Sequence, residues 1–153
     1  MTHNNPLSQY KWVFMGTPQI AVDFLTNLEQ SGVRPHLIVT IPDRPVGRKK
    51  TMTPPPVKEY ADMVGITCIQ AETLDEVIDN LVGYDFFCVF AYSELLKERH
   101  LSLPSHRVVN LHPSLLPQYR GAAPIMQAIL DDTRQTCITL MKPERGTASG
   151  PII

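Results

Sequence analysis

The sequence predicts an α/β fold, a doubly wound and mostly parallel sheet flanked by helices. Short apolar runs alternate along the chain with segments whose apolar residues recur at helical spacing, the pattern of successive strand and helix units. The run YDFFCVFAY at 84–92 is almost continuously apolar, which is typical of a central parallel strand buried on both faces. The chain has 153 residues, the usual size of one domain, so we predict a single domain over residues 1–153.

Three strands and three helices are expected before this central strand. The strands are predicted by apolar runs at 11–16, 36–41 and 66–70. Thr17 is predicted to cap the first helix and Pro18 to occupy its first position, and Ser31-Gly32 ends it. Further helices are expected at 57–63 and 74–82, the second of them amphipathic. The segment 42–56 is rich in proline, glycine and basic residues without an apolar period, which predicts a loop.

The same alternation continues after the central strand. A short helix is expected at 94–100, a strand at 107–112, an irregular loop at 113–124, a helix at 125–131 and a strand at 136–141. The sequence contains no internal repeat and no linker between domains.

The composition excludes several classes of protein. The formal net charge of −1 argues against a surface coated with basic charge for nucleic acid, although a local basic loop remains open. No run of about 18 apolar residues occurs, so no membrane span is expected. The first ten residues lack the features of a secretory signal and the arginines of a transit peptide, which predicts a cytoplasmic location.

The three cysteines, Cys68, Cys88 and Cys137, each lie in an apolar run typical of a strand. None shows C-x-x-C or the spacing of Cys and His metal ligands. We therefore predict buried free thiols and no metal site.

Polar and glycine-containing segments follow several of the predicted strands. Ligands of open parallel sheets bind outside the carboxyl ends of the strands, where the segments 15–17, 90–94, 110–120 and 142–150 are expected to meet. Gly16 is not followed by the second and third glycines of a dinucleotide-binding motif, so NAD binding is not expected.

One of these strand ends, Asn110-Leu111-His112, places two polar side chains on one side. Residues two apart on a strand face the same way, so Asn110 and His112 present an amide and an imidazole together, and Pro113 keeps His112 extended. Acyl transfer requires a donor that stabilises an oxyanion beside a group that handles a proton. A strand end satisfied by ordinary hydrogen bonds is the alternative interpretation of this spacing.

Several runs together resemble the methionyl-tRNA formyltransferase family. They are NLHPSLLPQYRGAAPI at 110–125, FMGTP at 14–18, PDRPVGRKK at 42–50 and VFAY at 89–92. The likeness extends over nearly the whole chain, and the motif S-L-L-P-x-x-R-G-A-x-P at 114–124 is long and specific. The resemblance implies a Rossmann-like formyltransferase fold. It also implies transfer of a formyl group from 10-formyltetrahydrofolate, the co-substrate, to the amino group of methionine on initiator tRNA.

The resemblance also implies roles for single residues. Asn110 matches the amide that polarises the formyl carbonyl, and His112 matches the acid/base that stabilises the tetrahedral intermediate. The loop through Arg120 would shape the floor of the site, with Gly121 permitting close approach of the backbone. The candidate residues for binding the folate are Phe90, Ala91, Tyr92, Leu95, Ser114, Gly121, Lys142, Glu144 and Gly146. For Tyr92, a role in the core alone is the alternative.

The run PDRPVGRKKTMTPPPVK at 42–58 favours tRNA as the acceptor. The resemblance implies that a basic insertion of this kind reaches the acceptor arm, and that sugar-formylating and purine-synthesising relatives generally lack this run. Arg44, Arg48, Lys49 and Lys50 are the candidate contacts to phosphate. A solvated charged loop is the alternative.

Two features depart from the pattern of the family. The motif G-x-D-x-G-[DP]-I is matched by GTASGPI at 146–152, so Ala148 occupies the place of the expected catalytic aspartate. Loss of a carboxylate that orients the histidine should lower the rate by on the order of 10^2 to 10^4, and Glu144 would replace it only if the loop bends back. The family also continues beyond this region and adds a small tRNA-binding β-barrel, so we expect a truncated catalytic domain without the barrel.

The leading hypothesis is therefore formyl transfer to methionyl-initiator tRNA, impaired as written by Ala148. One alternative is N-formylation of an amino-sugar nucleotide, and another is a non-catalytic module that binds folate or tRNA without turnover. No obligate protein partner is expected.

Overall fold

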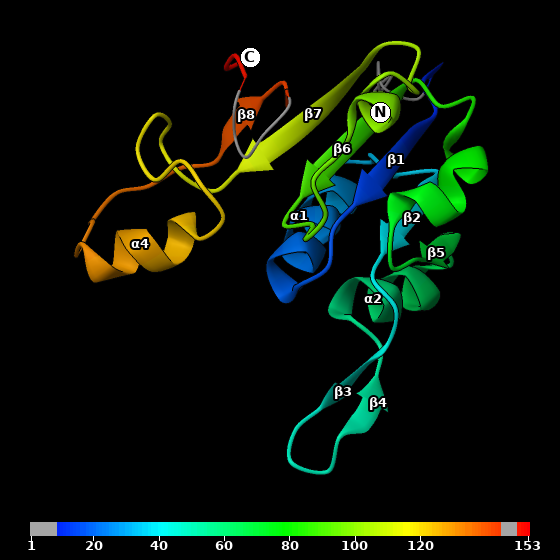
Figure 1. Ribbon diagram of the computed structural model, residues 1–153, viewed down its shortest axis with the longest axis horizontal. Coiled ribbons are helices and arrows are strands. Elements are labelled where there is room, and N and C mark those ends of the chain that lie inside the picture. Colours follow the sequence, from blue (N-terminus) through cyan, green and yellow to red (C-terminus); the bar gives the residue numbers. More distant parts are fainter. Residues whose placement is uncertain (1–8, 145–149) are drawn as a thin grey trace.

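Six strands form the central sheet of the protein, seen in a computed structural model that describes residues 9–144 and 150–153. In spatial order they are β5 (Cys68–Gln70), β2 (Leu37–Thr40), β1 (Trp12–Met15), β6 (Phe86–Phe90), β7 (Arg107–His112) and β8 (Thr139–Met141). The first five are parallel, and β8 runs antiparallel to β7 (Figure 1). The prediction of a mostly parallel, doubly wound sheet is confirmed.

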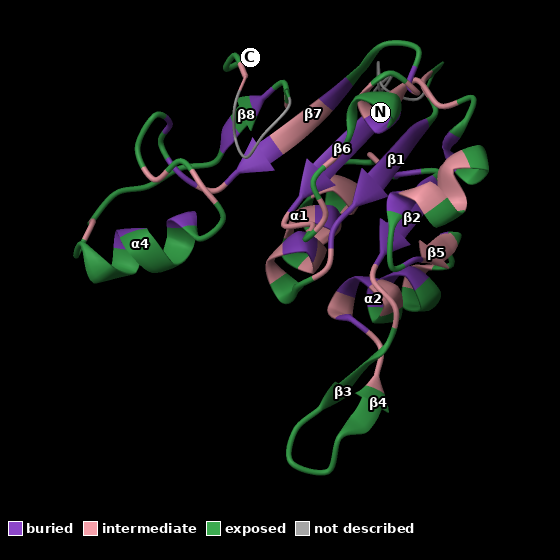
Figure 2. Cartoon of the chain, viewed as in Figure 1, coloured by how far each residue is buried: buried purple, intermediate pink, exposed green. Residues whose placement is uncertain are grey.

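Helical segments cover the two faces of this sheet and build two separate cores. These segments are α1 (Gln19–Gln30), α2 (Pro56–Val64), the 3-10 segment η2 (Leu74–Leu81) and α3 (Glu98–Leu101). The remaining helix, α4 (Pro124–Leu130), contributes no residue to either core. Because side chains alternate along a strand, Phe14 of β1 packs with α1 and α2, whereas Val13 and Met15 pack with η2. The sheet is therefore buried on both faces near its centre (Figure 2).

The strands β1 and β6 lie side by side at the centre of the sheet, and their packing leaves no room where β1 ends. Phe87 and Phe90 of β6 are fully buried in the two different cores. A Cβ atom on Gly16, directly after β1, would lie 2.7 Å from the carbonyl oxygen of Phe90. Glycine is required here because a backbone atom in the centre of a sheet cannot move aside cheaply.

The start of α1 differs from the prediction that Thr17 caps it. Pro18 occupies the N-cap position, with an extended ψ of 175°, and no side-chain capping bond is present. The helix begins one residue later than predicted, at Gln19, and its first turn closes with a bond from the N–H of Ala21 to the carbonyl of Pro18. The Thr17 hydroxyl is buried and has no hydrogen-bond partner in the described part of the chain.

The predicted loop at 42–56 contains a two-stranded antiparallel hairpin, so that prediction is wrong in part. Its strands are β3 (Arg44–Val46) and β4 (Thr51–Thr53), and the hairpin extends away from the sheet (Figure 1). Gly47 and Lys50 both have positive φ, and the N–H of Lys50 donates to the carbonyl of Gly47 at 3.1 Å. The strands are short and mostly exposed, so the sequence has no alternation of apolar residues that would predict them.

Two of the predicted helices are less regular than expected. The segment at 74–82 is a 3-10 segment with non-helical backbone angles at Val77, and it is fastened to the sheet by the fully buried Leu74 and Leu81 at its two ends. The helix expected at 94–100 is reduced to the single turn of α3. Residues 91–97, directly after β6, lie outside helices and strands.

The helix α4 stands apart from the main body of the sheet (Figure 1). Four apolar residues of this helix are 43 to 72% exposed: Ile125, Met126, Ile129 and Leu130. The short strand β8 likewise exposes Leu140, and among the described residues its edge away from β7 makes only an isolated bridge, between Met141 and Ile152.

The three cysteines are free, as predicted, but only one of them is buried. Cys88 in β6 is buried, Cys68 is half-buried, and Cys137 is exposed, so the prediction of burial is wrong for Cys137. Burial raises the pKa of the Cys88 thiol to about 12 and that of Cys68 to about 11. Cys137 precedes β8 at the outer part of the sheet, where strand-like composition does not bring burial.

Candidate functional site

A cavity of about 920 Å³ lies at the carboxyl ends of β1, β6 and β7. From β1 the chain proceeds outward to β2 and β5, and from β6 it proceeds in the opposite direction to β7. Ligands of doubly wound sheets bind at such a point, where the strand order reverses. The walls of the cavity come from Pro18 and Ile20, residues 91–96, residues 110–113, the segment that begins α4, and Pro143 with Glu144.

Asn110 and His112 both line this cavity from the end of β7. They are two residues apart on one strand and therefore project to the same side. Asn110 is half-buried, and its side-chain amide has no hydrogen-bond partner among residues 9–144 and 150–153. An amide without a partner at a cavity wall is available to bind the oxygen of a ligand. This favours a binding site over the alternative interpretation, in which ordinary hydrogen bonds within the protein satisfy Asn110.

The imidazole of His112 is held in one orientation. Its side chain is 5% exposed, and Nε2 lies 3.0 Å from the backbone carbonyl oxygen of Tyr119. A carbonyl only accepts, so Nε2 must carry the proton and donate it in this bond. The neutral ring then has its lone pair on Nδ1, which can accept a proton.

The loop that brings Tyr119 back to His112 is fixed by buried polar contacts. The hydroxyl of Ser114, which is fully buried, donates to the carbonyl of Gln118 at 2.7 Å. The carbonyl of Ser114 accepts a bond of 2.6 Å from Thr139 of β8. Tyr119 itself has a positive φ of 54°, and its hydroxyl lies 2.5 Å from that of Thr133. These contacts set the position of the carbonyl that orients the histidine.

The segment after β6 forms a continuous wall of the cavity. Ala91 has a positive φ of 50°, which turns the chain away from the strand direction. Tyr92 lines the cavity and also packs against the core that contains η2, so it belongs to both the cavity wall and the core. Burial raises the pKa of Tyr92, and the carboxylates Glu94 and Glu76 raise it further, so its hydroxyl stays neutral.

The structure brings together some of the residues predicted to bind the folate but not others. Those that line the cavity are Ala91, Tyr92, Leu95, Gly121 and Glu144. The side chain of Phe90 lies in the core against Phe24, and Ser114 is fully buried in its loop, so neither side chain reaches the cavity. Lys142 lines a separate cavity beside Arg107. Gly146 and Ala148 lie outside the described residues.

The four basic candidates all lie in the hairpin, but not in equivalent surroundings. Arg44 of β3 makes an ion pair with Glu72. Arg48, Lys49 and Lys50 form the exposed turn, and within the described residues their side chains have no ion-pair partner. The hairpin contributes no lining residue to the cavity, so the basic turn and the cavity are separate surfaces.

Within the part of the chain that the structure covers, no cluster of three or more His, Cys, Asp or Glu side chains is arranged to hold a metal ion. None of the helices there is long and apolar enough to cross a membrane.

The residues that orient the His112 ring and fix its loop were not predicted from the sequence. Tyr119, Thr133 and Thr139 act through contacts between segments that lie 7 to 25 residues apart. The only signal for Tyr119 was its place within the motif at 114–124. The contribution of α4 to the cavity wall was also not foreseen, because it depends on where the loop after β7 returns.

Comparison with known proteins identifies relatives over nearly the whole chain. A model of the formyl transferase family matches residues 10–153. The methionyl-tRNA formyltransferase of Halorhodospira halophila is 43% identical over 144 residues, which are 92% of this chain and 46% of that protein. That of Sulfurovum sp. is 41% identical over 150 residues, which are 95% of this chain and 49% of that protein.

Solved structures show the same fold at lower identity. The phosphoribosylglycinamide formyltransferase of Bacillus halodurans aligns with a TM-score of 0.71 at 23% identity and covers 94% of this chain and 76% of its own. A sugar 3N-formyl transferase, WlaRD, aligns with a TM-score of 0.60 at 19% identity, over 94% of this chain and 50% of its own. The chain spans about half the length of the curated relatives it matches. With a cavity at the switch point of the sheet and a family model that matches residues 10–153, the chain belongs to the formyl transferase family.

Proposed function

We propose that this chain forms the folate and transfer site of an enzyme that formylates methionyl-initiator tRNA. The donor is 10-formyltetrahydrofolate, bound in the cavity at the ends of β6 and β7. The observation that carries the proposal is the joint presence of Asn110 and His112 on the wall of one cavity. Relatives named methionyl-tRNA formyltransferase that are 40 to 43% identical to this chain support the choice of reaction.

The chemistry follows from these two side chains. The amine of the acceptor attacks the formyl carbon, and the carbonyl oxygen becomes an oxyanion that the Asn110 amide stabilises by donating a hydrogen bond. The bond from the formyl carbon to the folate nitrogen then breaks, and tetrahydrofolate leaves. The attacking amine loses one proton and the leaving nitrogen gains one, and Nδ1 of His112 is suited to carry that proton.

The size and lining of the cavity support folate as the donor. A volume of about 920 Å³ suits a ligand of this size, and a mainly apolar wall with few polar groups is usual for such sites. Residues 91–95 line the cavity, so their backbone N–H and carbonyl groups would be available to a pterin edge. Gly121, with a φ of 141°, permits an approach that other residues resist.

The basic turn of the hairpin supports tRNA as the acceptor. Arg48, Lys49 and Lys50 are exposed and clustered at the tip of an extended element, an arrangement suited to contacts with phosphates. A reaction on initiator tRNA would take place in the cytoplasm. The acceptor arm would have to span from the hairpin to the cavity, because the two surfaces are separate.

Ala148 stands where the family motif has an aspartate, and we propose that this impairs the reaction. A carboxylate there would favour the charged form of His112 in the transition state. Of the described residues, two carboxylates line the cavity, Glu94 and Glu144. Glu94 already accepts a hydrogen bond from the N–H of Leu74, and Glu144 is the one near Ala148 in the sequence. Any residual activity would therefore depend on Glu144.

The proposal is tested with 10-formyltetrahydrofolate and methionyl-tRNA, by measuring formylmethionyl-tRNA. The Ala148→Asp variant should form product at least about 10^2 times faster than the parent chain. Asn110→Ala in that background should lower the rate by about 10^2 to 10^3. Glu144→Gln should abolish residual activity of the parent and spare the Ala148→Asp variant. Absence of both folate binding and product would reject the proposal.

A non-catalytic module that binds folate or tRNA is a second candidate, favoured by Ala148 alone. It predicts binding by calorimetry without product even at high protein concentration, in the parent and in Ala148→Asp alike. Formylation of an amino-sugar nucleotide is separated from both by offering each acceptor in turn. The proposal requires methionyl-tRNA to be preferred.

A further inference from the structure

The cavity wall formed by residues 91–96 is irregular, and its shape needs an external support. Six consecutive residues line the cavity, and all of them lie between the end of β6 and the beginning of α3. Such a segment has no ladder of backbone hydrogen bonds to maintain its shape. Contacts from neighbouring elements must therefore hold it in place if it is to present a fixed surface.

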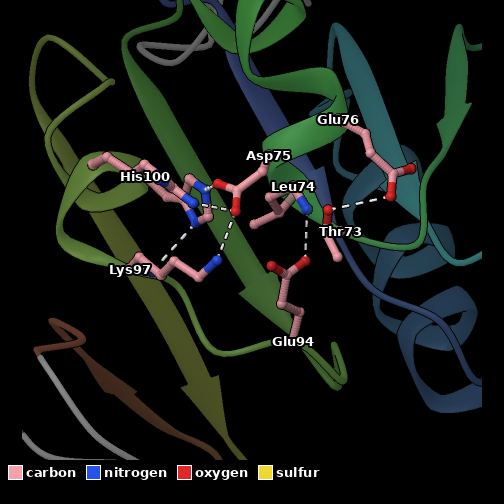
Figure 3. Close-up of polar contacts among 8 residues, drawn as sticks. Thr73, Leu74, Asp75, Glu76, Glu94, Lys97 and His100 are labelled. Atoms are coloured by element: carbon pink, nitrogen blue, oxygen red, sulfur yellow. Dashed lines mark hydrogen bonds and ion pairs between the residues drawn. The ribbon is translucent and has the colours of Figure 1, made fainter.

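The first such contact ties the middle of the wall to the start of η2. Oε2 of Glu94 accepts a hydrogen bond of 2.7 Å from the backbone N–H of Leu74 (Figure 3). Leu74 begins η2, and Thr73 before it makes no side-chain capping bond. Glu94 therefore satisfies an N–H group that the helical segment itself leaves without a partner. Leu74 is fully buried, so this anchor point belongs to the rigid core.

The second contact ties the end of the same segment to the next residue of η2. Asp75 pairs through Oδ2 with Lys97, at 2.6 Å, and with Arg99. Its Oδ1 lies 2.7 Å from Nε2 of His100 (Figure 3). The hydrogen bonds from Lys97 and then Arg99 hold the pKa of Asp75 well below its usual range, so the carboxylate is ionised at neutral pH.

His100 connects this carboxylate to the beginning of α3. The side chain is fully buried, and its Nδ1 accepts a hydrogen bond of 3.2 Å from the backbone N–H of Lys97. A nitrogen that accepts carries no proton, so the proton lies on Nε2 and is donated to Asp75. Both ring nitrogens are engaged. Losing either bond would leave a buried polar group without a partner, which resists local opening.

We propose that Asp75 and His100 are positioning residues that hold the wall at 91–96 in the shape required by the folate donor. Neither residue lines the cavity, so both act through the segment that they fasten. This inference rests on the proposed function for the identity of the ligand. Asp75 and His100 lie 25 residues apart and approach only because η2 and α3 lie on the same face of the sheet.

The expected effect is on affinity rather than on turnover. If removing the tether leaves the wall in the binding shape for about one tenth of the time, the apparent Kd for the folate rises about tenfold. At saturating folate the wall is driven back into shape, so kcat changes little and KM carries the loss. Asn110 and His112 stand on β7 and keep their positions.

The test compares Asp75→Ala with Asp79→Ala, an exposed aspartate on the same segment that serves as a matched control. Binding of tetrahydrofolate is measured by calorimetry, KM and kcat are measured in the Ala148→Asp background, and amide hydrogen exchange is followed for residues 92–97 without ligand. Asp75→Ala should weaken binding about tenfold and accelerate exchange of this segment, and Asp79→Ala should do neither.

Two variants of His100 separate positioning from general loss of stability. A glutamine side chain is long enough to donate to Asp75, and an asparagine can accept from the N–H of Lys97 but is too short to reach Asp75. The inference requires His100→Gln to retain most of the affinity and His100→Asn to lose it. Equal losses in both would overturn it.

The failure of this inference and that of the proposed function are distinguishable. A parent chain that binds no folate rejects the proposed function, and exchange at 92–97 still decides whether the tether holds the wall. Unchanged exchange in Asp75→Ala, or faster exchange with unaltered folate affinity, overturns the assignment of Asp75 and His100.

Discussion

The hairpin formed by β3 and β4 offers a quantitative test of the proposed contact with tRNA. Its turn places Arg48, Lys49 and Lys50 together on an exposed tip, and none of them is paired with an acidic side chain in the described residues. The perturbation is the triple replacement of these residues by alanine. The hairpin stands away from the sheet, so the change should leave the melting temperature and the cavity at the ends of β6 and β7 unaltered (Figure 1).

The magnitude follows from the number of free cations. Each phosphate contact made by a lysine or arginine on duplex nucleic acid contributes about 0.9 to the slope of log K against log salt concentration. Loss of three contacts should therefore reduce that slope by about 2.7, so that a rise from 50 to 200 mM salt weakens the parent roughly 40-fold more than the variant.

Arg44 provides the control within the same hairpin. Its guanidinium is already paired with Glu72, and both side chains are about half exposed. To contact a phosphate, Arg44 must give up that ion pair, so Arg44→Ala should change the slope less than Arg48→Ala does. The assay is fluorescence anisotropy with labelled initiator tRNA at several salt concentrations. A triple variant with the slope of the parent would refute the role assigned to the turn.

Three further predictions concern the core and the titrating groups. Gly16→Ala should lower the free energy of unfolding by about 1–3 kcal/mol in a urea titration, because the added Cβ would lie 2.7 Å from a backbone oxygen; an unchanged midpoint would contradict the packing described. In Asp75→Asn, the stability deficit should be full at neutral pH and should shrink as pH falls below the ordinary carboxyl pKa of 3.8. In that range Asp75 of the unfolded parent binds a proton, whereas Asp75 of the folded parent stays ionised, so the parent loses stability. A deficit that stays constant down to acid pH would argue against the ion pairs of Asp75. A thiol reagent at neutral pH should label Cys137 rapidly, whereas Cys88 should react only after unfolding, because Cys88 is buried and its pKa is raised to about 12. Mass spectrometry of the labelled peptides measures both rates, and fast labelling of Cys88 in the folded protein would contradict its burial.

Several features of the protein follow from local sequence patterns. The apolar runs at 11–16, 36–41 and 84–92 contain β1, β2 and β6, because a strand buried on both faces needs apolar side chains at every position. The placement of Asn110 and His112 on one side of β7 follows from the two-residue period of a strand. Both inferences use only residues close together in the chain.

Other features depend on residues that are distant in sequence. The hairpin at 44–53 forms with little apolar alternation, and the helix predicted at 94–100 gives way to an irregular wall held by η2. The burial of a cysteine depends on how far from the sheet's centre its strand lies, which its own apolar neighbours do not reveal.

The amino-acid sequence by itself determined the layered α/β architecture and the strand end that presents an amide beside an imidazole. Both follow from residue patterns that repeat every two to four residues. Only the tertiary structure decided which nitrogen of His112 carries the proton, through the carbonyl of Tyr119, and which elements close the cavity around it. The physical reason is that a hydrogen bond between distant segments exists only after the whole chain has packed, whereas a periodic apolar pattern acts within each segment before any packing occurs.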